Sequence, residues 1–432
     1  MKLKKLLIPL IASISFSTTL SSCSPFIFIE GDNSTSNEVV GEGTRNTMFF
    51  ALYNYYGIEG QHFTNRWLGM KDALENHGIK VTNDANEKDA RKFKIDMTNS
   101  DLPKDTEIYM VNNQTWDTGL QFTKPLTNKQ PLAVISTCNG VEFASAQIKA
   151  NSPKTQNATM GGFSKLYGDA FLDGSLNYLA TKYTCHVAPI FAACVDAVDG
   201  TPLRTKNNEA LHLSVEHWDI KSIDEYQKHR EIDNYSDNPT IKKSDLDRFF
   251  TATSEDFDAE KLTKWCSKSS YEDIKAIYDA NRETPDVKRE GRKIKAGLIV
   301  PGSVNDVVQA YIDYMRGYLA DVYNVEFVTN QNVTTSNDQP TACKALINSG
   351  VEFIISLQDD TNRNKAIKLA NENGVYFANA GTCQNDKDYA EVKDLQYFVG
   401  SIGSSINEER RATRVMTEYY LSIIKERGVV SE

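Results

Sequence analysis

The fold is decided by two stretches that share one pattern, TMFFALYNYYGIEGQHFTNRWLGMKDALENHGIKVT at Thr47–Thr82 and KAGLIVPGSVNDVVQAYIDYMRGYLADVYNVEFVT at Lys295–Thr329. Each contains an apolar segment of strand length, a polar loop, an apolar pattern with helical spacing and a second short apolar segment. Strands that alternate with helices indicate a parallel sheet with right-handed crossovers. Each stretch therefore predicts the start of an α/β unit.

The repeat continues beyond these two stretches. EIYMV at Glu107–Val111 matches EFIIS at Glu352–Ser356, and AVISTC at Ala133–Cys138 matches ANAGTC at Ala378–Cys383. The same number of residues separates the members of both pairs. Two similar α/β units in one chain usually face each other, and the carboxyl ends of parallel strands form the ligand site of such sheets. A binding cleft between the units is the first hypothesis.

The last matched segments, Ala158–Tyr183 and Phe398–Leu421, each predict a strand that ends in glycine, followed by a long helix. Between the units, short charged helices predict an appendage. We therefore expect an α/β fold with two similar Rossmann-like lobes, each a parallel sheet flanked by helices. The expected boundaries are a signal peptide at 1–22, a flexible tether at 23–46, lobe A at 47–200, a helical appendage with its linker at 201–294 and lobe B at 295–432.

The N-terminus has the pattern of a secretory signal. Lysines precede an apolar stretch at Leu6–Leu20, which is too short and too rich in Ser and Thr for a stable membrane span. The stretch ends in Leu20-Ser21-Ser22-Cys23, which resembles a bacterial lipobox. That resemblance implies cleavage before Cys23 and lipid on its thiol, which would anchor the protein at the extracytoplasmic face of the cell membrane. An ordinary signal peptide with an incidental cysteine is the alternative.

Composition and motifs argue against several classes of function. A net charge of −10 disfavours nucleic acid, because binding phosphates requires a basic face. The chain has no G-x-S-x-G, H-E-x-x-H or zinc-ligand motif, so we expect neither an enzyme nor a metal or cofactor site. The six cysteines beyond Cys23 leave disulfide pairing open, with Cys343–Cys383 as one possibility and buried free thiols preferred for Cys185 and Cys194.

Several segments resemble the type 1 periplasmic binding proteins. GVEFIISLQDDTNRNKAIKLANENGVYFANAG at Gly350–Gly381 is similar to that family's strand–loop–helix–strand run, and Lys295–Tyr318 resembles its opening strand, ligand loop and helix. Tyr397–Leu421 and Gly161–Tyr183 resemble its lobe-crossing segments, and Asp196–His229 resembles the tail of lipid-anchored members that serve ABC importers. In the family that tail comes last. The chain is therefore either a permuted single clamshell or a truncated fusion of two.

Candidate ligand residues follow the predicted strands, where polar and aromatic side chains gather. Amides and carboxylates bond hydroxyl groups, and Tyr and Trp offer flat faces for stacking. For each residue, a solvated loop or a helix cap is the alternative. The set is Asn54, Tyr55, Tyr56, Gln61, Asn113, Trp116, Thr137, Asn139, Ser303, Asn305, Asp306, Asp359, Asp360, Asn379 and Thr382.

These observations predict an extracytoplasmic lipoprotein that captures a small polar solute, a sugar or nucleoside, and delivers it to an ABC permease. The mechanism would be closure of two lobes about the ligand. A sensory binding lipoprotein with the same cleft is the first alternative. A surface lipoprotein without a ligand, derived from a degenerate fusion, is the second.

Overall fold

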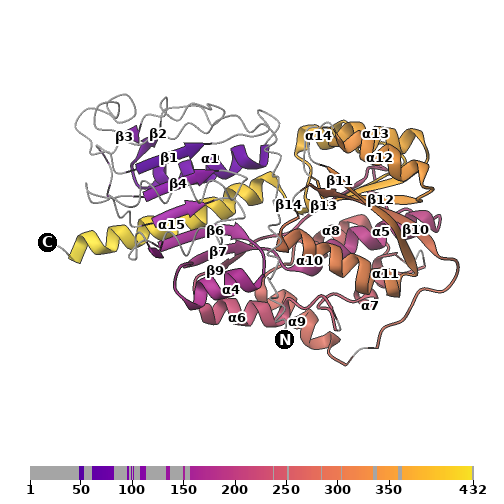
Figure 1. The fold of residues 1–432 in the computed structure, drawn as a ribbon, viewed down its shortest axis with the longest axis horizontal. Coiled ribbons are helices and arrows are strands. Elements are labelled where there is room, and N and C mark those ends of the chain that lie inside the picture. Colours follow the sequence, from indigo (N-terminus) through magenta and orange to yellow (C-terminus); the bar gives the residue numbers. More distant parts are fainter. Residues whose placement is uncertain are drawn as a thin grey trace, which may run out of the picture.

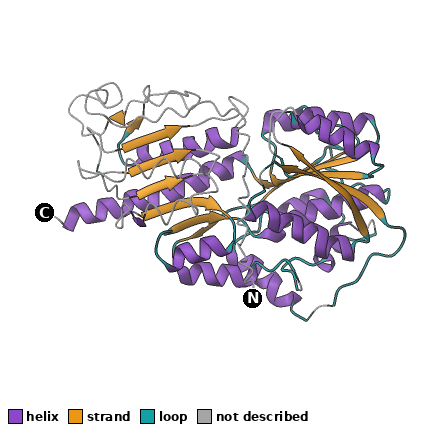
Figure 2. Ribbon diagram, in the orientation of Figure 1, coloured by secondary structure: helices purple, strands orange, loops and turns teal. Residues whose placement is uncertain are grey.

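The computed structural model describes most of the chain from residue 156 onward and shorter segments before it. The described residues are 48–52, 61–81, 95–96, 99, 101, 108–112, 133–136, 149–150, 156–236, 238–250, 253–283, 285–302, 304–333, 338–358 and 362–430. They form two lobes that lie side by side, each with a twisted sheet and flanking helices (Figures 1 and 2). The expected α/β fold with parallel sheets is confirmed.

The N-terminal lobe is built on a sheet whose strand order is β1-β4-β5-β6-β7-β9. All neighbours are parallel except β7 and β9. Its strands are β1 (Met48–Leu52), β4 (Ile108–Asn112), β5 (Ala133–Ser136), β6 (Gln156–Gly161), β7 (Tyr178–Thr181) and β9 (Trp218–Ile220). A separate antiparallel pair joins β2 (Lys80–Val81) to β3 (Ile95–Asp96).

The C-terminal lobe is built on a wholly parallel sheet in the order β11-β10-β12-β13-β14-β8. Its strands are β10 (Ile294–Pro301), β11 (Val325–Val333), β12 (Phe353–Ser356), β13 (Tyr376–Thr382), β14 (Phe398–Ser404) and β8 (Leu211–Ser214). The strands matched in the sequence occupy the same places: β1, β4, β5 and β6 correspond in order to β10, β12, β13 and β14. The repeat in the sequence therefore corresponds to the same order of matched strands in both sheets.

The helices cover both faces of the sheets. Beside the N-terminal sheet lie α1 (Gln61–Asn76), α4 (Lys165–Leu172), α6 (Ile223–Ile232) and α15 (Ile406–Val430) (Figure 1). The others are α5 (Ala188–Val198), α7 (Lys243–Phe250), α8 (Ala259–Cys266), α9 (Tyr271–Asn281), α10 (Asp306–Tyr314), α11 (Ala320–Val322), α12 (Gln339–Asn348), α13 (Arg363–Glu372) and α14 (Asp386–Ala390), with a 3-10 turn at Thr184–Val187 and a π-helical turn at Met315–Leu319.

The segment 201–294 is not a separate helical appendage. Its first strand, β8, pairs with β14 and completes the C-terminal sheet, and its second, β9, pairs with β7 and completes the N-terminal sheet. Its helices pack on the lobes as well: α7 lies against α5, α8 against β8, and α6 against α4. Each strand needs a partner for its backbone groups, and these partners lie in the two existing sheets.

Two helices belong to a different lobe than predicted. Helix α5 falls within the expected lobe A but packs against β12, β13 and β14 of the other lobe. It is apolar on every side and almost wholly buried, which suits a helix enclosed between a sheet and other helices. Helix α15, placed in the expected lobe B, instead runs along α1. The two lobes are therefore one interwoven body, because each contains elements from both parts of the chain.

The long helix expected at the end of the segment Ala158–Tyr183 is instead the helix α4 followed by the strand β7. Helix α4 ends at Leu172, and Gly174 takes a left-handed conformation with φ +73° that reverses the chain. Leu176 and Leu179 are buried, but Leu172 is 67 % exposed. The leucines of this segment have helical spacing although they lie in a helix, a turn and a strand. Short apolar runs fit the helical period and the strand period alike, so the sequence did not separate α4 from β7.

The described cysteines are all buried free thiols: Cys185, Cys194, Cys266, Cys343 and Cys383. The preference for free thiols at Cys185 and Cys194 is confirmed. The possible Cys343–Cys383 bridge is wrong, because the two residues bond different carbonyls: Cys343 bonds that of Ala366, and Cys383 those of Leu213 and Gly403.

Close packing of α1 on α15 depends on Gly69. A Cβ atom at Gly69 would lie 2.2 Å from the carbonyl oxygen of Arg410 and from Oγ1 of Thr413. We expect Gly69→Ala to lower the free energy of unfolding by about 1–3 kcal/mol, because the backbones of the helices must separate. Urea denaturation measures this. Gly317→Ala is the control, since a Cβ there meets nothing within 4 Å. Equal stability of both variants would contradict the close approach.

Candidate functional site

The carboxyl ends of the two sheets meet at the junction between the lobes. Lys182 follows β7, and its Nζ donates to the carbonyl of Gly381 at 2.8 Å and to Oγ of Ser404 at 2.9 Å, at the ends of β13 and β14. Gly162 follows β6, and a Cβ there would lie 2.5 Å from Cγ2 of Val307, in the first turn of α10. Ligand loops of parallel sheets lie at these edges, so the junction is the candidate site.

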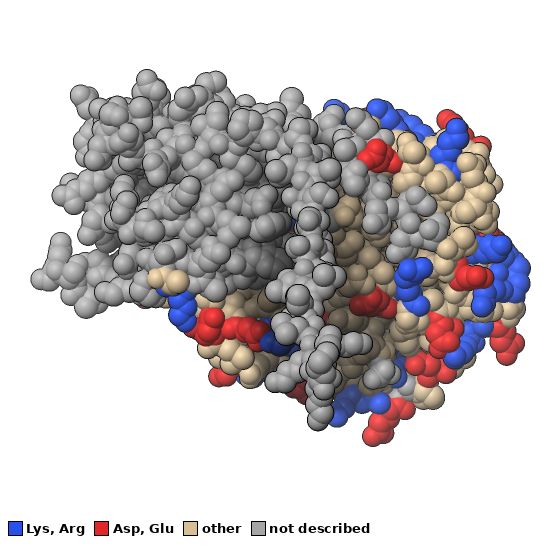
Figure 3. Space-filling view, in the orientation of Figure 1, with Lys and Arg blue, Asp and Glu red and all other residues tan. Residues whose placement is uncertain are grey.

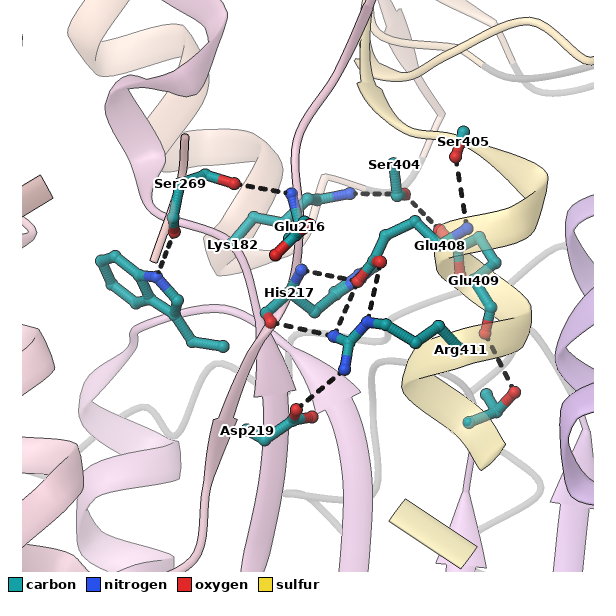
Figure 4. A network of polar contacts seen from close by, with 12 residues as sticks. Lys182, Glu216, His217, Asp219, Ser269, Ser404, Ser405, Glu408, Glu409 and Arg411 are labelled. Carbon is teal, nitrogen blue, oxygen red and sulfur yellow. Dashed lines mark hydrogen bonds and ion pairs between the residues drawn. The ribbon is translucent and has the colours of Figure 1, made fainter. Parts of the chain in front are cut away.

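Helix α15 begins at this junction with two adjacent glutamates that bond different partners (Figure 4). Glu409 is wholly buried and accepts from Nε of Arg66 at 2.5 Å and from Oγ of Ser404. Burial opposes its ionisation, but the charge of Arg66, the hydrogen bond from His62 and the charge of Lys182 together outweigh burial, so the pKa of Glu409 lies well below its ordinary value. Ser404 also accepts from Lys182, so Glu409 connects α1, β14 and the end of β7.

Glu408 ties the same helix to β9. It accepts from the backbone N–H of His217 at 2.8 Å, from its ring Nδ1 at 3.1 Å and twice from Arg411 at 2.8 Å. Arg411 in turn reaches Oδ2 of Asp219 at 3.1 Å (Figure 4). Burial would raise the pKa of Glu408, but the bonds from His217 and Arg411 lower it to about 2. The crossing helix is therefore held by ion pairs to α1 and to the β9 strand of the N-terminal lobe, and by a hydrogen bond to Ser404 of the C-terminal lobe.

His186 lies at the crossing between β7 and α5. It is wholly buried, its Nδ1 lies 2.6 Å from the carbonyl of Tyr183, and its ring meets that of Tyr311 edge-on at 5.1 Å between centroids. A carbonyl can only accept, so Nδ1 carries the proton and Nε2, which has no partner, is an acceptor. Burial, together with the charge of Lys182, lowers the pKa of His186 to about 3, so the ring is neutral.

A row of buried polar side chains crosses the C-terminal sheet beside the junction. Ser356, Asn379 and Ser401 are register partners on β12, β13 and β14, so their side chains share one face. Gln339 and Gln384 flank them: Nε2 of Gln339 donates to Oγ of Ser356 at 2.7 Å, and the backbone N–H of Gln384 donates to Oγ of Ser401 at 3.3 Å. All five are at most 2 % exposed. We call these five residues the polar row.

Most of the sequence-predicted ligand residues lie outside the described residues, so they remain predictions. This holds for Cys23 and for Asn54, Tyr55, Tyr56, Asn113, Trp116, Thr137, Asn139, Ser303, Asp359 and Asp360.

The predicted residues that the structure describes fall in different environments. Gln61 is the first residue of α1. Asn305 caps α10, with its Oδ1 accepting from the N–H of Val308 at 2.9 Å, and Asp306 is exposed in the first turn of that helix. Asn379 lies in the polar row, and Thr382 is half-buried at the end of β13. Of these, Asn379 has the environment most suited to a ligand contact.

Sequence reasoning missed Lys182, His186, Gln339 and Gln384. Lys182 lay inside a segment predicted to be helical, which hid its place at a strand end. Gln384 directly follows the matched Cys383, and Gln339 precedes a proline, a common start of a helix. The position of Gln384 after a strand and that of Gln339 at the start of a helix could have marked both residues as candidates from the sequence.

Charge and metal chemistry give no competing site among the described residues. On the face shown in Figure 3, Lys and Arg side chains of the C-terminal lobe are interspersed with Asp and Glu. No three His, Cys, Asp or Glu side chains within the described part gather as metal ligands. None of the helices described there combines the length and apolarity needed to cross a membrane.

Comparison with known proteins gives likenesses of structure only. No family model matches the chain, and no curated protein matches it by sequence. Solved structures to which it is similar include an ABC transporter solute-binding protein from Clostridium phytofermentas with bound L-rhamnose (8 % identity, TM-score 0.42, covering 88 % of this chain and 81 % of that one). A second is the periplasmic component of an ABC-type sugar transport system from Hahella chejuensis (9 % identity, TM-score 0.44, covering 88 % of this chain and 93 % of that one). A third is the glucose-galactose binding protein GanP from Geobacillus stearothermophilus (9 % identity, TM-score 0.43, covering 88 % of this chain and 92 % of that one).

The low pKa of Glu408 predicts the acid stability of the junction. Its folded pKa of about 2 lies below the ordinary value of 4.5, so its contribution is complete above about pH 4.5 and is lost as the pH falls toward 2. We expect Glu408→Gln to lower the free energy of unfolding at pH 7 by about 2–3 kcal/mol and to make its decline below pH 4.5 shallower. Denaturant titrations from pH 2 to 7 measure both. Exposed Glu372→Gln is the control, and an acid slope unchanged in Glu408→Gln would refute the assignment.

Proposed function

We propose that this protein captures a small polar solute, a sugar or nucleoside, between its two lobes and delivers it to an ABC permease. The proposal rests on one observation: the carboxyl ends of parallel strands in the two sheets meet at a junction, where the chain also crosses between the lobes at Lys182 and between β14 and α15. Loops at such edges bind ligands, and two lobes joined at one side close about a ligand by bending where the chain crosses.

Buried polar groups near that junction support a polar ligand. The amide of Asn379 is 2 % exposed, and neither its oxygen nor its nitrogen has a hydrogen-bond partner. An unpaired buried amide costs about 1–3 kcal/mol per group, so such groups are retained where a ligand or water pairs them. The matched structures named above bind sugars according to their descriptions, but they are too dissimilar to contribute to this choice.

Gly162 and Val307 give a direct test of closure, because their contact leaves no space for a Cβ atom on the glycine. A thermal-shift screen of D-glucose, D-galactose, D-xylose, D-ribose, adenosine and uridine first identifies a ligand, since binding to the native state raises its apparent stability. We expect Gly162→Ala to weaken that ligand at least about tenfold in calorimetry, because the lobes cannot close fully.

The double variant Gly162→Ala/Val307→Ala should recover most of the affinity, since it removes both Cγ atoms and leaves only the Cβ of residue 307, at 3.2 Å. Unchanged affinity in Gly162→Ala would show that closure does not bring these residues together. A screen in which no compound raises the melting temperature would count against the proposed function itself and favour a surface lipoprotein without a ligand.

We also propose the lipid anchor at Cys23, which the signal-like segment and the Leu20-Ser21-Ser22-Cys23 sequence support. A protein tethered in this way stays beside a membrane permease. Cys23→Ala should move the protein from the membrane fraction to the soluble fraction after expression in a bacterial host, as judged by ultracentrifugation. Ser24→Ala is the control, because it leaves the lipobox cysteine in place. Membrane retention of Cys23→Ala at the unmodified level would place the anchor elsewhere.

A further inference from the structure

The polar row leaves more hydrogen-bonding groups unpaired than any other cluster among the described residues. Four buried side-chain atoms in it have no partner: Oε1 of Gln339, Oε1 of Gln384, and both Oδ1 and Nδ2 of Asn379. Burying such atoms unpaired is costly, and a core with no use for them would place leucine or valine there. Four such atoms, two on Asn379 of the sheet and one on each of the glutamines that flank it, therefore point to a bound group that pairs them.

The orientations of the two glutamine amides are determined by backbone carbonyls. Nε2 of Gln339 lies 3.3 Å from the carbonyl oxygen of Gln358, which can only accept, so this atom is the nitrogen. Nδ2 of Asn364 donates to the carbonyl of Asp388 at 2.9 Å, so Oδ1 of Asn364 is an acceptor. That acceptor receives Nε2 of Gln384 at 2.7 Å. The unpaired atoms of both glutamines are therefore carbonyl oxygens.

A ligand at the row must consequently donate hydrogen bonds. Gln339 and Gln384 present only acceptors, and Asn379 presents one acceptor and a donor NH2 group. The row crosses three strands, about 10 Å at the usual strand spacing. A single donor cannot serve both ends, so the ligand needs several donors along its length. Hydroxyl groups of a sugar meet this requirement, since each donates one bond and accepts others.

The surroundings disfavour a charged ligand of either sign. Carbonyl oxygens present negative dipole ends, which repel a carboxylate or phosphate. Two cations lie beside the row: Nζ of Lys182 donates to the carbonyl of Gly381, two residues along β13 from Asn379, and Arg363 directly precedes Asn364, the partner of Gln384. Arg363 is only 2 % exposed, and its Nη2 lies 4.0 Å from Oδ2 of Asp388, so this region already holds a buried guanidinium whose charge would oppose a second buried cation.

We infer that the polar row is a ligand subsite for an uncharged polyhydroxy compound, with Gln339, Asn379 and Gln384 as specificity-determining residues. This inference rests on the proposed function, because it names the ligand class that the same junction takes. The inference adds a subsite in the C-terminal lobe to the proposed function, built from amides on the α12–α13 side of the sheet. It also adds a selectivity: ligands with neutral hydrogen-bond donors bind, and ligands with ionised groups are excluded.

The first test compares one sugar skeleton in three charge states. Calorimetry on the mature protein uses neutral D-glucose, anionic D-glucuronate and cationic D-glucosamine, or the matching set for whichever neutral sugar gives the larger thermal shift. We expect the acid and the amine to bind at least about tenfold more weakly than the neutral sugar. Equal or tighter binding of either charged compound would overturn the inference while leaving solute capture intact.

The second test uses the cost of the unpaired amide. Asn379→Leu keeps the approximate size of the side chain and removes both unpaired atoms, so the ligand-free variant should melt at a higher temperature than the unmodified protein, while affinity for the neutral sugar falls at least about tenfold. A purely structural asparagine would give the opposite sign in stability. Asn348→Leu, at an exposed position on α12, is the matched control and should change neither quantity.

The outcomes separate the inference from the proposed function. A raised melting temperature with unchanged sugar affinity would mean that the row holds ordered water only, which overturns the inference and leaves solute capture in place. A lowered melting temperature would also overturn it. If Asn379→Leu does not fold, Gln339→Met, of similar length, decides: unchanged affinity refutes the subsite. Failure of the unmodified protein to bind any compound of the panel would refute solute capture and the subsite together.

Discussion

The structure depends on the buried carboxylates at the start of α15. This helix leaves the end of β14 in one lobe and packs along α1 in the other, so its first turn stands where the lobes join. A buried carboxylate is tolerated only where charges and donors pair it, and Glu409 has Arg66 and Ser404 for this purpose. Removal of any partner would leave a charge in a low-dielectric site. The geometry of the junction is therefore narrowly constrained.

The same constraint gives the junction two properties that a solute-binding protein requires. Ion pairs from Glu408 and Glu409 hold the crossing helix in one place, so the lobes keep their relative position along the hinge. Beside these ion pairs, Gly162 meets Val307 with no side chain of its own. Strong pairing at the hinge and a glycine at a strand end are compatible with the closure proposed above.

In the polar row, the packing that would best stabilise the sheet conflicts with the proposed binding of a polar ligand. On the same face, Ile354 and Phe377 belong to an apolar cluster with α12 and α13, and two residues further along their strands that cluster gives way to Ser356 and Asn379. The change occurs toward the carboxyl ends, where a parallel sheet meets its ligand. Apolar residues would pack better there, and the proposed subsite gives a reason for the amides.

The sequence by itself determined the fold class and the repeat. Apolar segments such as Ala296–Val300 and Phe353–Ser356 alternate with segments of helical spacing, and that local pattern predicts parallel strands. It also pointed to Asn379 at a strand end. Tertiary structure alone decided where β8, β9, α5 and α15 belong, because a short strand or an apolar helix carries no mark of the sheet that it joins. It likewise decided the partners of Lys182 and Gln384, since hydrogen bonds between residues about 200 and 20 positions apart depend on how strands align in space and leave no periodic signal in the chain.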